Sequence, residues 1–195
     1  MRLGIDIDGT INLLADRLNI LAKRFNANTR HRGRGVAGSF DIADANGWTK
    51  VQTTAFWEEY GNEAYITAEP MRNVSVMLNK LHSEGNSLYF ITKRSASYKG
   101  VYEVTNAWLI AYNIPYTDIF MGSDNKLMIA NNLAIDIFVE DNVDNALQIA
   151  SGGIQVIVPE WDYNAELAKW NPLIHRVRKD WEMIYSMIHT ISRET

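Results

Sequence analysis

The 195-residue chain contains no cysteine, and this absence excludes disulfides, cysteine-ligated zinc sites and thiol nucleophiles. It contains no apolar stretch long enough to cross a bilayer, so no membrane partner is expected. A signal peptide is not expected either, because the short apolar run near the N-terminus leads directly into acids. A net charge of −4 argues against a surface-wide grip on nucleic acid, so no stable nucleic-acid partner is expected. Together these absences favour a cytoplasmic protein.

The composition is that of an ordinary globular protein, with 47% apolar and 22% charged residues. Four short apolar runs rich in β-branched and aromatic residues are typical of strands buried in a parallel sheet, at residues 3–7, 87–91, 135–139 and 154–158. Helical patterns lie between and after them, at residues 71–84, 98–112, 126–133, 143–150 and 177–191. This alternation predicts an α/β fold with a helix-covered sheet.

Residues 12–72 interrupt the alternation. A helix is predicted over residues 13–25, whereas residues 28–48 are rich in Gly, Asn and Arg and are predicted to be irregular. We therefore expect a core formed by residues 1–11 and 73–195. Residues 12–72 are expected to form a small, mainly helical cap inserted after the first strand.

The irregular stretch contains two patterns that suggest ligand binding. A G-x-G-x-x-G pattern is formed by Gly33, Gly35 and Gly38. No strand is predicted before it and no helix opens after it, so we interpret it as a loop and not as a dinucleotide site. A basic cluster is formed by Arg30, His31, Arg32 and Arg34. A solvated loop is the favoured interpretation of this cluster, and an anion-attracting flap is the alternative.

Two acids follow the first predicted strand. Asp6 and Asp8 are two residues apart, so in a strand their side chains point to the same side. Ligands of open α/β sheets bind beyond the carboxyl ends of the strands. Two close carboxylates repel each other, and a divalent cation relieves that repulsion. An all-oxygen ligand set in a chain without thiols points to Mg²⁺, and Gly9 allows a tight turn whose N–H groups can hold an anion.

A second acid pair, Glu140 and Asp141, follows the strand predicted at residues 135–139. Each acid alone is explained equally well as a helix cap or a surface charge. The carboxyl ends of parallel strands share one edge of the sheet, so the two acid pairs are expected to converge on one metal ion.

A hydroxyl and several cations are expected at the same edge. Thr92, Lys93 and Arg94 follow the strand predicted at residues 87–91, and Lys126 opens the helix before the next acidic strand end. Taken separately, residues 92–94 are explained as a polar end of a strand and Lys126 as a surface lysine. Taken together, the hydroxyl and the cations suit the binding of a phosphate group.

These motifs resemble those of the haloacid dehalogenase superfamily of phosphohydrolases. The resemblance rests on DIDGT at residues 6–10, Thr92 after the second strand, Lys126, and FVEDN at residues 138–142. It implies a Rossmann-like, three-layer α/β/α parallel sheet and a Mg²⁺-dependent phosphomonoester hydrolase.

Within this superfamily the chain is most similar to the 5′(3′)-deoxyribonucleotidases and related bacterial nucleotidases. The similarity rests on the cap after the first motif, on AFWEEYGNEAYITAEPMRNV at residues 55–74, and on PEWDYN at residues 159–164. The second motif reads TKR here instead of Thr-Ser-Pro, and the fourth reads Glu-Asp instead of Asp-Asp.

The resemblance implies a role for each motif residue. Asp6 is the expected nucleophile and Asp8 the general acid and base. The expected metal ligands are Asp6, the backbone carbonyl of Asp8, Asp141, and Glu140 through water. Thr92, Lys126 and the backbone at Gly9 are expected to hold phosphate oxygens. Further candidates for substrate binding are Thr10, Lys93 and Arg94. Thr10 is alternatively a turn residue that supports the site without touching the substrate, and Arg94 alternatively pairs with an acid of the cap.

The cap aromatics Phe40, Trp48, Phe56 and Trp57 are expected either to stack on a nucleobase or to pack between cap and core. A small phosphorylated substrate, a nucleoside monophosphate, is therefore expected. A sugar phosphate or a terminal phosphate of a nucleic acid is the alternative, and a non-catalytic nucleotide-binding module is less favoured. A homodimer is compatible with the sequence.

Overall fold

The computed structural model describes residues 1–195 apart from 32, 37–38, 40, 96–97, 170 and 195. In this part of the chain six strands form one sheet in the order β3-β2-β1-β4-β5-β6. The strands are β1 (Arg2–Ile5), β2 (Ser87–Ile91), β3 (Asp118–Phe120), β4 (Ile137–Val139), β5 (Gln155–Pro159) and β6 (Ile174–Val177). Every pairing of neighbours is parallel, so all carboxyl ends lie at one edge of the sheet.

Strand β1 is central, because it pairs with β2 on one side and with β4 on the other. Its side chains Leu3 and Ile5 are completely buried, as expected for a strand covered on both faces. The chain runs outwards from β1 to β3 and then returns to place β4 on the other side of β1. Ligands of such sheets bind where the strand order reverses, and here that point lies between β1 and β4.

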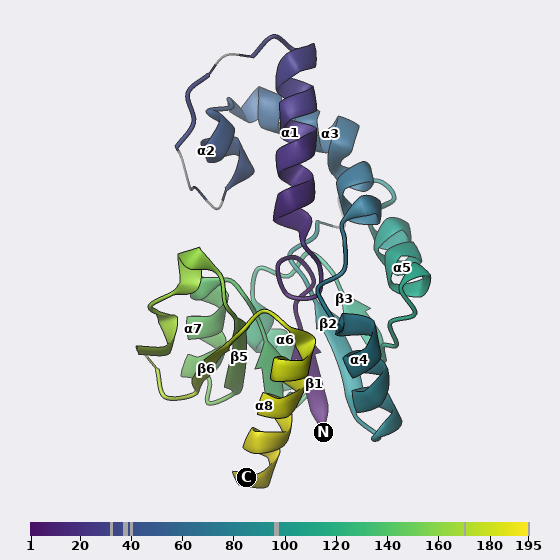
Figure 1. Cartoon of the computed structure of the whole chain (residues 1–195), viewed down its shortest axis with the longest axis vertical. Helices are drawn as coiled ribbons and strands as arrows, with labels where there is room; N and C mark the ends of the chain where they lie inside the picture. The colour runs from purple at the N-terminus through teal and green to yellow at the C-terminus, as the bar shows by residue number, and fades with distance from the viewer. Residues whose placement is uncertain (32, 37–38, 40, 96–97, 170, 195) are drawn as a thin grey trace.

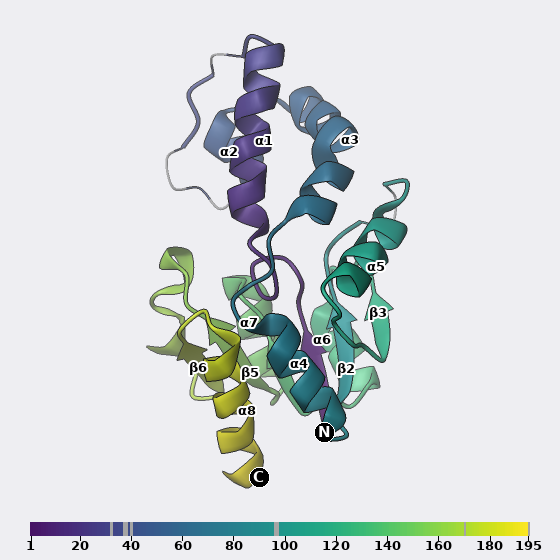
Figure 2. The ribbon, with the colours of Figure 1, turned by 45° about the vertical axis from the view of Figure 1, so that its right-hand side comes forward.

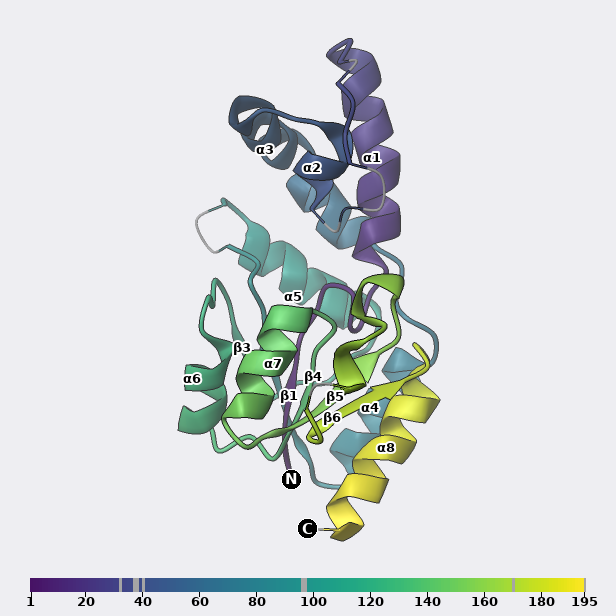
Figure 3. The ribbon, with the colours of Figure 1, turned by 90° about the vertical axis from the view of Figure 1, so that its left-hand side faces the viewer.

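Helices cover both faces of the sheet. On one face lie α4 (Val74–Ser83), α5 (Val101–Ala111) and α8 (Trp181–Glu194), and on the other lie α6 (Lys126–Asn132) and α7 (Val143–Ser151). Trp108 and Trp181 belong to the buried cluster on the first face, and Ala130 and Ile149 to that on the second. Figure 3 shows α4 and α8 on one side of the sheet and α6 and α7 on the other. This arrangement confirms the predicted three-layer α/β/α fold. None of the helices in the described part of the chain is long and apolar enough to cross a membrane.

The four predicted strands correspond to β1, β2, β4 and β5. The prediction lacks β3 and β6, which form the two edges of the sheet. Strand β3 has only three residues and begins with Asp118, so its apolar signal is very short. Strand β6 contains His175 and Arg176 and ends at Val177. The helix predicted over residues 177–191 is therefore wrong at its start, since α8 begins at Trp181.

The cap region contains α1 (Leu14–Asn28), α2 (Ile42–Asn46) and α3 (Lys50–Thr67). Figures 1 and 2 show these helices beyond the carboxyl end of β1. Phe25 and Phe56 belong to a buried cluster of their own between α1 and α3. The prediction of irregular structure over residues 28–48 is wrong for α2. This short helix is capped by Asp41, whose carboxylate accepts hydrogen bonds from the N–H groups of Ala43 and Asp44.

Two extended segments connect the cap region to the sheet, and they lie side by side. The N–H of Leu13 donates to the carbonyl of Glu69, and the N–H of Met71 donates to the carbonyl of Ile11, both at 2.8 Å. Helix α3 also packs against α5. The boundaries between residues 11 and 12 and between 72 and 73 stay predictions, and both lie close to these paired segments.

Candidate active site

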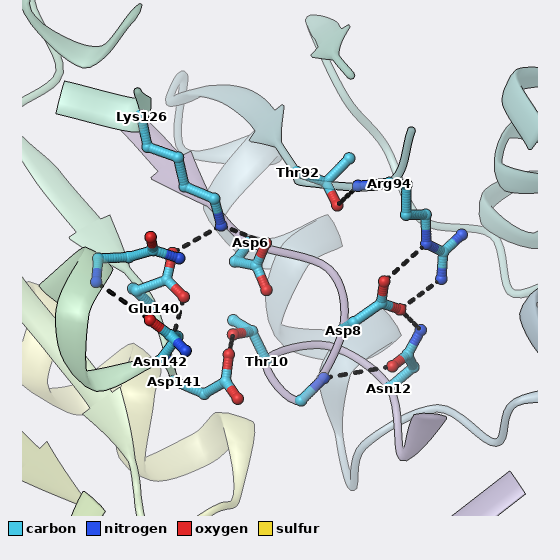
Figure 4. A network of polar contacts seen from close by, with 12 residues as sticks. Asp6, Asp8, Thr10, Asn12, Thr92, Arg94, Lys126, Glu140, Asp141 and Asn142 are labelled. Carbon is cyan, nitrogen blue, oxygen red and sulfur yellow. Dashed lines mark hydrogen bonds and ion pairs between the residues drawn. The ribbon is translucent and has the colours of Figure 1, made fainter. Parts of the chain in front are cut away.

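Asp6 follows β1 directly, at the edge of the sheet where the carboxyl ends meet (Figure 4). Its N–H still donates to the carbonyl of Val139 on β4, at 2.9 Å, and its side chain is buried. Gly9 then turns the chain with a φ of +81°. A Cβ at Gly9 would lie 2.3 Å from Oδ2 of Asp141, so only glycine allows this close approach. The loop after β1 is thereby held against the end of β4.

Lys126 lies between two of the acids. Its Nζ donates to Oδ1 of Asp6 at 2.5 Å and to Oε2 of Glu140 at 2.6 Å. The lysine is the first residue of α6, and its side chain is only 1% exposed. Burial by itself would lower the pKa of this ammonium, but the two carboxylates outweigh burial and raise the pKa. Lys126 is therefore a permanently charged group in a buried acidic centre.

Asp6, Glu140 and Asp141 form a compact acidic cluster. One carboxylate oxygen from each lies within 4.8 Å of the others, and all three residues are buried. Burial, and then the neighbouring Glu140, raise the pKa of Asp6 to about 7, although Lys126 opposes the shift. Burial and Glu140 also raise the pKa of Asp141 well above its usual value. Three buried carboxylates around one lysine thus lack positive charge, and a divalent cation fits that deficit.

Asp141 is held on both of its oxygens. Thr10 donates its hydroxyl to Oδ1 at 3.3 Å, and the hydroxyl of Tyr163 donates to Oδ2. The amide of Asn164 donates to the backbone carbonyl of Asp141 at 3.0 Å. Burial and the Asp141 charge raise the pKa of Tyr163, so its hydroxyl stays protonated and remains a donor. Thr10, expected to bind substrate, is completely buried and contacts Asp141 here.

Asp8 points away from this cluster and has a cation of its own (Figure 4). Arg94 donates from Nε to Oδ2 of Asp8 at 2.9 Å and from Nη2 to Oδ1 at 2.6 Å. The amide of Asn12 donates to the same Oδ1 at 3.0 Å. Arg94 was expected to contact phosphate or an acid of the cap, and its acidic partner in the structure is Asp8. The carboxylate of Asp8 is not part of the acidic cluster among the described residues.

Thr92 and Lys93 lie at the end of β2. The side chain of Thr92 is buried, and its hydroxyl oxygen accepts a hydrogen bond from the N–H of Arg94 at 3.2 Å. Among the described residues this hydroxyl has no acceptor of its own, so its proton is available to a ligand. Lys93 is exposed and lines the cavity described next. The strand exit thus places one hydroxyl and one exposed ammonium group at the edge of the sheet.

A cavity of about 330 Å³ opens beside the acidic centre. It is bordered by residues of the sheet edge, of all three cap helices and of the segment after β5. The lining consists of Asp8, Gly9, Leu14, Ala15, Leu18, Asp41, Ile42, Thr53, Trp57, Tyr65, Lys93, Arg94, Asp141, Trp161 and Tyr163. Most charged groups of the lining therefore belong to the sheet edge, whereas the cap contributes mainly apolar side chains together with Asp41 and Thr53.

The aromatic candidates of the cap occupy different places. Trp57 lines the cavity, whereas Trp48 and Phe56 pack into the buried cluster of the cap. The rings of Trp48 and Phe56 are 4.7 Å apart, and Phe56 is completely buried. Phe40 lies outside the described residues. Trp48 and Phe56 therefore pack within the cap, whereas the position of Trp57 leaves stacking on a nucleobase as a prediction for this residue.

The cavity also contains aromatics that the sequence analysis did not single out as candidates. Trp161 and Tyr163 stack with ring centroids 6.0 Å apart and planes at 10°. The indole N–H of Trp161 donates to the carbonyl of Gly9 at 2.9 Å. Tyr65 of α3 forms a further wall. The sequence contained one signal for Trp161 and Tyr163, which is their position along the chain. They lie in PEWDYN at the end of β5, and every strand of this sheet ends at the same edge.

The glycine-rich and basic loop lies elsewhere. A Cβ at Gly35 would lie 1.9 Å from the carbonyl oxygen of Ala45, so this glycine permits close packing of the loop on α2. The His31 ring lies 3.0 Å from the carbonyl oxygen of Asn46 and 2.9 Å from the amide nitrogen of Gln52. Arg32 and Gly38, which belong to the two patterns, lie outside the described residues. The lining of the cavity includes no residue of the described part of this loop.

Comparison with known proteins gives the following relatives. No family model matches the chain. The chain is 30% identical over 169 residues to "Putative nucleotidase YqfW" of Bacillus subtilis, and this match covers 84% of the chain and 82% of that protein. It is 26% identical over 187 residues to "Nucleotidase CA_C3379" of Clostridium acetobutylicum, with 94% and 91% covered. The solved structure of "haloacid dehalogenase-like family protein SP0104", a hydrolase from Streptococcus pneumoniae, matches in fold with a TM-score of 0.70 at 13% identity, over 97% of both chains.

Proposed function

The chain belongs to the bacterial family that includes YqfW, within the haloacid dehalogenase superfamily of phosphohydrolases, and from this premise we propose that it hydrolyses nucleoside monophosphates with the help of Mg²⁺. The observation that carries the proposal is the continuity between the acidic centre and the cavity. Asp8 and Asp141 border the same space as Trp57 and Trp161. A molecule with a phosphate at one end and an aromatic ring at the other matches this order of groups.

The donor set of the acidic cluster fits a magnesium ion. Asp6, Glu140 and Asp141 offer oxygen atoms only, and Lys126 balances just part of their charge. In the proposal Asp6, Asp141 and the backbone carbonyl of Asp8 bind the ion, while Glu140 holds water around it. When bound, the ion supplies positive charge that offsets the repulsion between a phosphate and the carboxylate of Asp6.

The phosphate oxygens are held in this proposal by groups around Asp6. Lys126 contributes a buried positive charge, and Thr92 contributes its hydroxyl proton. Lys93, exposed at the cavity, attracts the anion as it enters. Donors fixed before the substrate binds stabilise developing charge at low reorganisation cost.

Asp6 then attacks the phosphorus atom. Lys126 occupies Oδ1 of Asp6, which leaves Oδ2 as the attacking atom. A bond forms between Oδ2 and phosphorus, and the bond from phosphorus to the ester oxygen breaks. The electron pair leaves with the ester oxygen, which takes a proton from Asp8. In the second step Asp8 accepts a proton from water, the water oxygen attacks phosphorus, and the carboxylate of Asp6 is released together with inorganic phosphate.

The size of the cavity supports a small substrate. Ligand sites of proteins span roughly 300–1,000 Å³, and the cavity of about 330 Å³ falls at the lower end of that range. The part of the substrate that lies against Trp57 and against the stacked Trp161 and Tyr163 meets flat aromatic surfaces. Such surfaces favour an aromatic ring over a sugar ring or an open chain.

A substrate screen tests this proposal. Purified protein with Mg²⁺ is given nucleoside 5′- and 3′-monophosphates, sugar phosphates and oligonucleotides with terminal phosphates, and released phosphate is measured. We expect the highest kcat/KM for nucleoside monophosphates and no turnover by the Asp6→Asn variant. A preference for sugar phosphates or for oligonucleotide ends would overturn the choice of substrate. Equal phosphate release by Asp6→Asn and the unaltered protein would overturn the hydrolase itself.

A further inference from the structure

Asp6 and Asp8 follow the same strand and are only two residues apart, which creates a difficulty. Asp6 and Asp8 would both be attracted to a divalent cation, yet an acid that donates protons cannot also bind the metal through its carboxylate. In the structure the two acids are separated by their cations. Asp6 pairs with Lys126 inside the acidic cluster, and Asp8 pairs with Arg94 outside it.

The contact between Arg94 and Asp8 fixes the direction of the carboxylate. Two N–H groups of the planar guanidinium meet both oxygens of Asp8, at 2.9 and 2.6 Å, and such paired hydrogen bonds define an orientation as well as an attraction. Asn12 adds a third donor on Oδ1 at 3.0 Å. The carboxylate still borders the cavity, because 26% of the Asp8 side chain is exposed. It therefore faces the space where a leaving group would lie.

Arg94 is itself held in place by the protein around it. Its side chain is completely buried, and its Nη1 donates to the hydroxyl oxygen of Thr105 on α5 at 2.9 Å. That hydroxyl in turn donates to the carbonyl of Val101 at 2.7 Å, so its proton is already used. A buried arginine with these contacts has little freedom to swing towards a bound phosphate.

The cap contributes the last contact. The guanidinium carbon of Arg94 lies 4.1 Å from the centre of the Tyr65 ring, a distance typical of a cation–π contact. Tyr65 belongs to α3, and its ring stacks on that of Trp57 at 5.9 Å. A chain of contacts thus runs from a cavity-lining aromatic of the cap, through Tyr65 and Arg94, to Asp8.

We propose that Arg94 is a positioning residue that keeps Asp8 out of the metal cluster and aims it at the leaving group, with Tyr65 making this position depend on the cap. This inference rests on the proposed hydrolase function. Proton donation by Asp8 matters for a poor leaving group such as a nucleoside alkoxide. It matters much less for p-nitrophenolate, which leaves without a proton.

The test compares these two leaving groups. The kcat/KM values of Arg94→Met and Arg94→Lys are measured with the preferred nucleoside monophosphate and with p-nitrophenyl phosphate. This constant reports the step in which the leaving group departs, and not the later hydrolysis of the aspartyl phosphate, in which Asp8 is the proposed base for either substrate. General acid catalysis contributes about 10²–10⁴-fold. We therefore expect Arg94→Met to lose at least about 10-fold more kcat/KM on the nucleotide than on the aryl phosphate. Arg94→Lys keeps the charge but not the paired contact, so its loss should be intermediate.

Arg24→Met is the matched control. Arg24 also makes a paired contact with a carboxylate, at 3.2 and 2.9 Å from Glu63, and also lies over a tyrosine ring, 5.5 Å from the centre of Tyr60. It lies away from the cavity, on the cap. This variant should leave unchanged the ratio of the kcat/KM values for the nucleotide and for p-nitrophenyl phosphate. A changed ratio would show that any disturbance of the cap has this effect, whether or not it involves Asp8.

A double variant separates positioning from stability. If Arg94 acts through Asp8, then Asp8→Asn and the double variant Asp8→Asn/Arg94→Met should show the same kcat/KM for the nucleotide within about 3-fold. Tyr65→Leu should shift the substrate ratio in the same direction as Arg94→Met, by a smaller factor. Circular dichroism and thermal unfolding establish that each variant is folded. Should Arg94→Met not fold, Arg94→Lys and Tyr65→Leu carry the same comparison.

The outcomes separate this inference from the proposed function. A protein that hydrolyses neither substrate before any substitution overturns the function, and the inference falls with it. A protein that hydrolyses both, with Arg94→Met losing equal factors on each, overturns the inference alone. Additive losses in the double variant would also overturn it.

Discussion

The ammonium of Lys126 lies 2.5 Å from Oδ1 of Asp6, and both groups are buried. The same ammonium lies 2.6 Å from Glu140, so one lysine neutralises part of two buried carboxylates. Removing one partner of a buried ion pair leaves an unpaired charge in a poorly solvated place. The stability of the acidic centre and its chemistry therefore depend on the same contact.

Lys126→Met should destabilise the metal-free protein strongly. Breaking a buried pair costs about 3–5 kcal/mol in the free energy of unfolding, and urea unfolding at pH 7 measures it. Lys169→Met is the matched control, because Lys169 pairs with Glu166 at the same 2.5 Å on the exposed surface. An exposed pair contributes little, so this control should unfold like the unaltered protein. Equal losses in the two variants would contradict the buried role of Lys126.

Magnesium should stabilise the protein more at high pH than at low pH. The pKa of Asp6 is about 7 in the folded protein, above its usual 3.8, so the folded state binds this proton more tightly than the unfolded state. The metal-free protein should therefore lose stability as the pH rises from about 4 to about 7. Magnesium competes with the proton, so the Mg²⁺-induced rise in Tm should be larger at pH 8 than at pH 5.

The control for this prediction is Asp44→Asn, which removes an exposed acid of the cap. In this variant the Mg²⁺-induced rise in Tm should differ between pH 5 and pH 8 by as much as in the unaltered protein. Asp6→Asn should abolish most of it. An equal rise in Tm at pH 5 and pH 8 in the unaltered protein would contradict the account of the cluster.

Gly9→Ala should damage the site beyond its effect on the backbone. A Cβ at this position would meet Oδ2 of Asp141 at 2.3 Å, and the residue has a φ of +81°. Gly153→Ala is the matched control, because Gly153 has a φ of +85° and no atom within 4 Å of an added Cβ. The control should cost about 1–2 kcal/mol in the free energy of unfolding, which is the strain of this backbone conformation. Gly9→Ala should cost more and should also weaken Mg²⁺ binding, measured by calorimetry.

Tyr163→Phe should weaken Mg²⁺ binding without preventing folding. The tyrosine hydroxyl donates to Oδ2 of Asp141 and so helps to orient a proposed metal ligand. Loss of a group that orients a ligand typically costs about 10–100-fold in metal affinity. Tyr185→Phe is the control, because Tyr185 donates to Glu84 at 2.6 Å, on the exposed surface of α8 and α4. A Kd for Mg²⁺ that is unchanged in Tyr163→Phe would show that Thr10 alone orients Asp141.

The sequence predicts the central sheet and the residues at its edge for a clear physical reason. Buried parallel strands are continuous apolar runs, and their ends share one edge, so the acids after β1 and β4 had to meet. The edge strands β3 and β6 lack such runs, because an edge strand can be short and polar. Their positions depend on the rest of the sheet.

The walls of the cavity were harder to predict. The apolar residues of α3 are spread around the helix, so the sequence does not tell which face turns inwards. Phe56 faces the buried cluster of the cap, while its neighbour Trp57 borders the cavity. The contacts of Tyr65 with Arg94 and of Tyr163 with Asp141 join segments that are distant along the chain, and no local pattern encodes them.

The central claim is that Asp6 carries the phosphoryl group during turnover, and chemical trapping tests it most directly. The protein is mixed with Mg²⁺ and its preferred substrate, quenched in acid and reduced with borohydride, which converts an aspartyl phosphate into homoserine. Mass spectrometry of the N-terminal peptide then identifies the modified position. The account predicts homoserine at position 6 only when substrate is present. Full turnover with Asp6 unmodified, or with the modification on Asp8 or Asp141 instead, would contradict it.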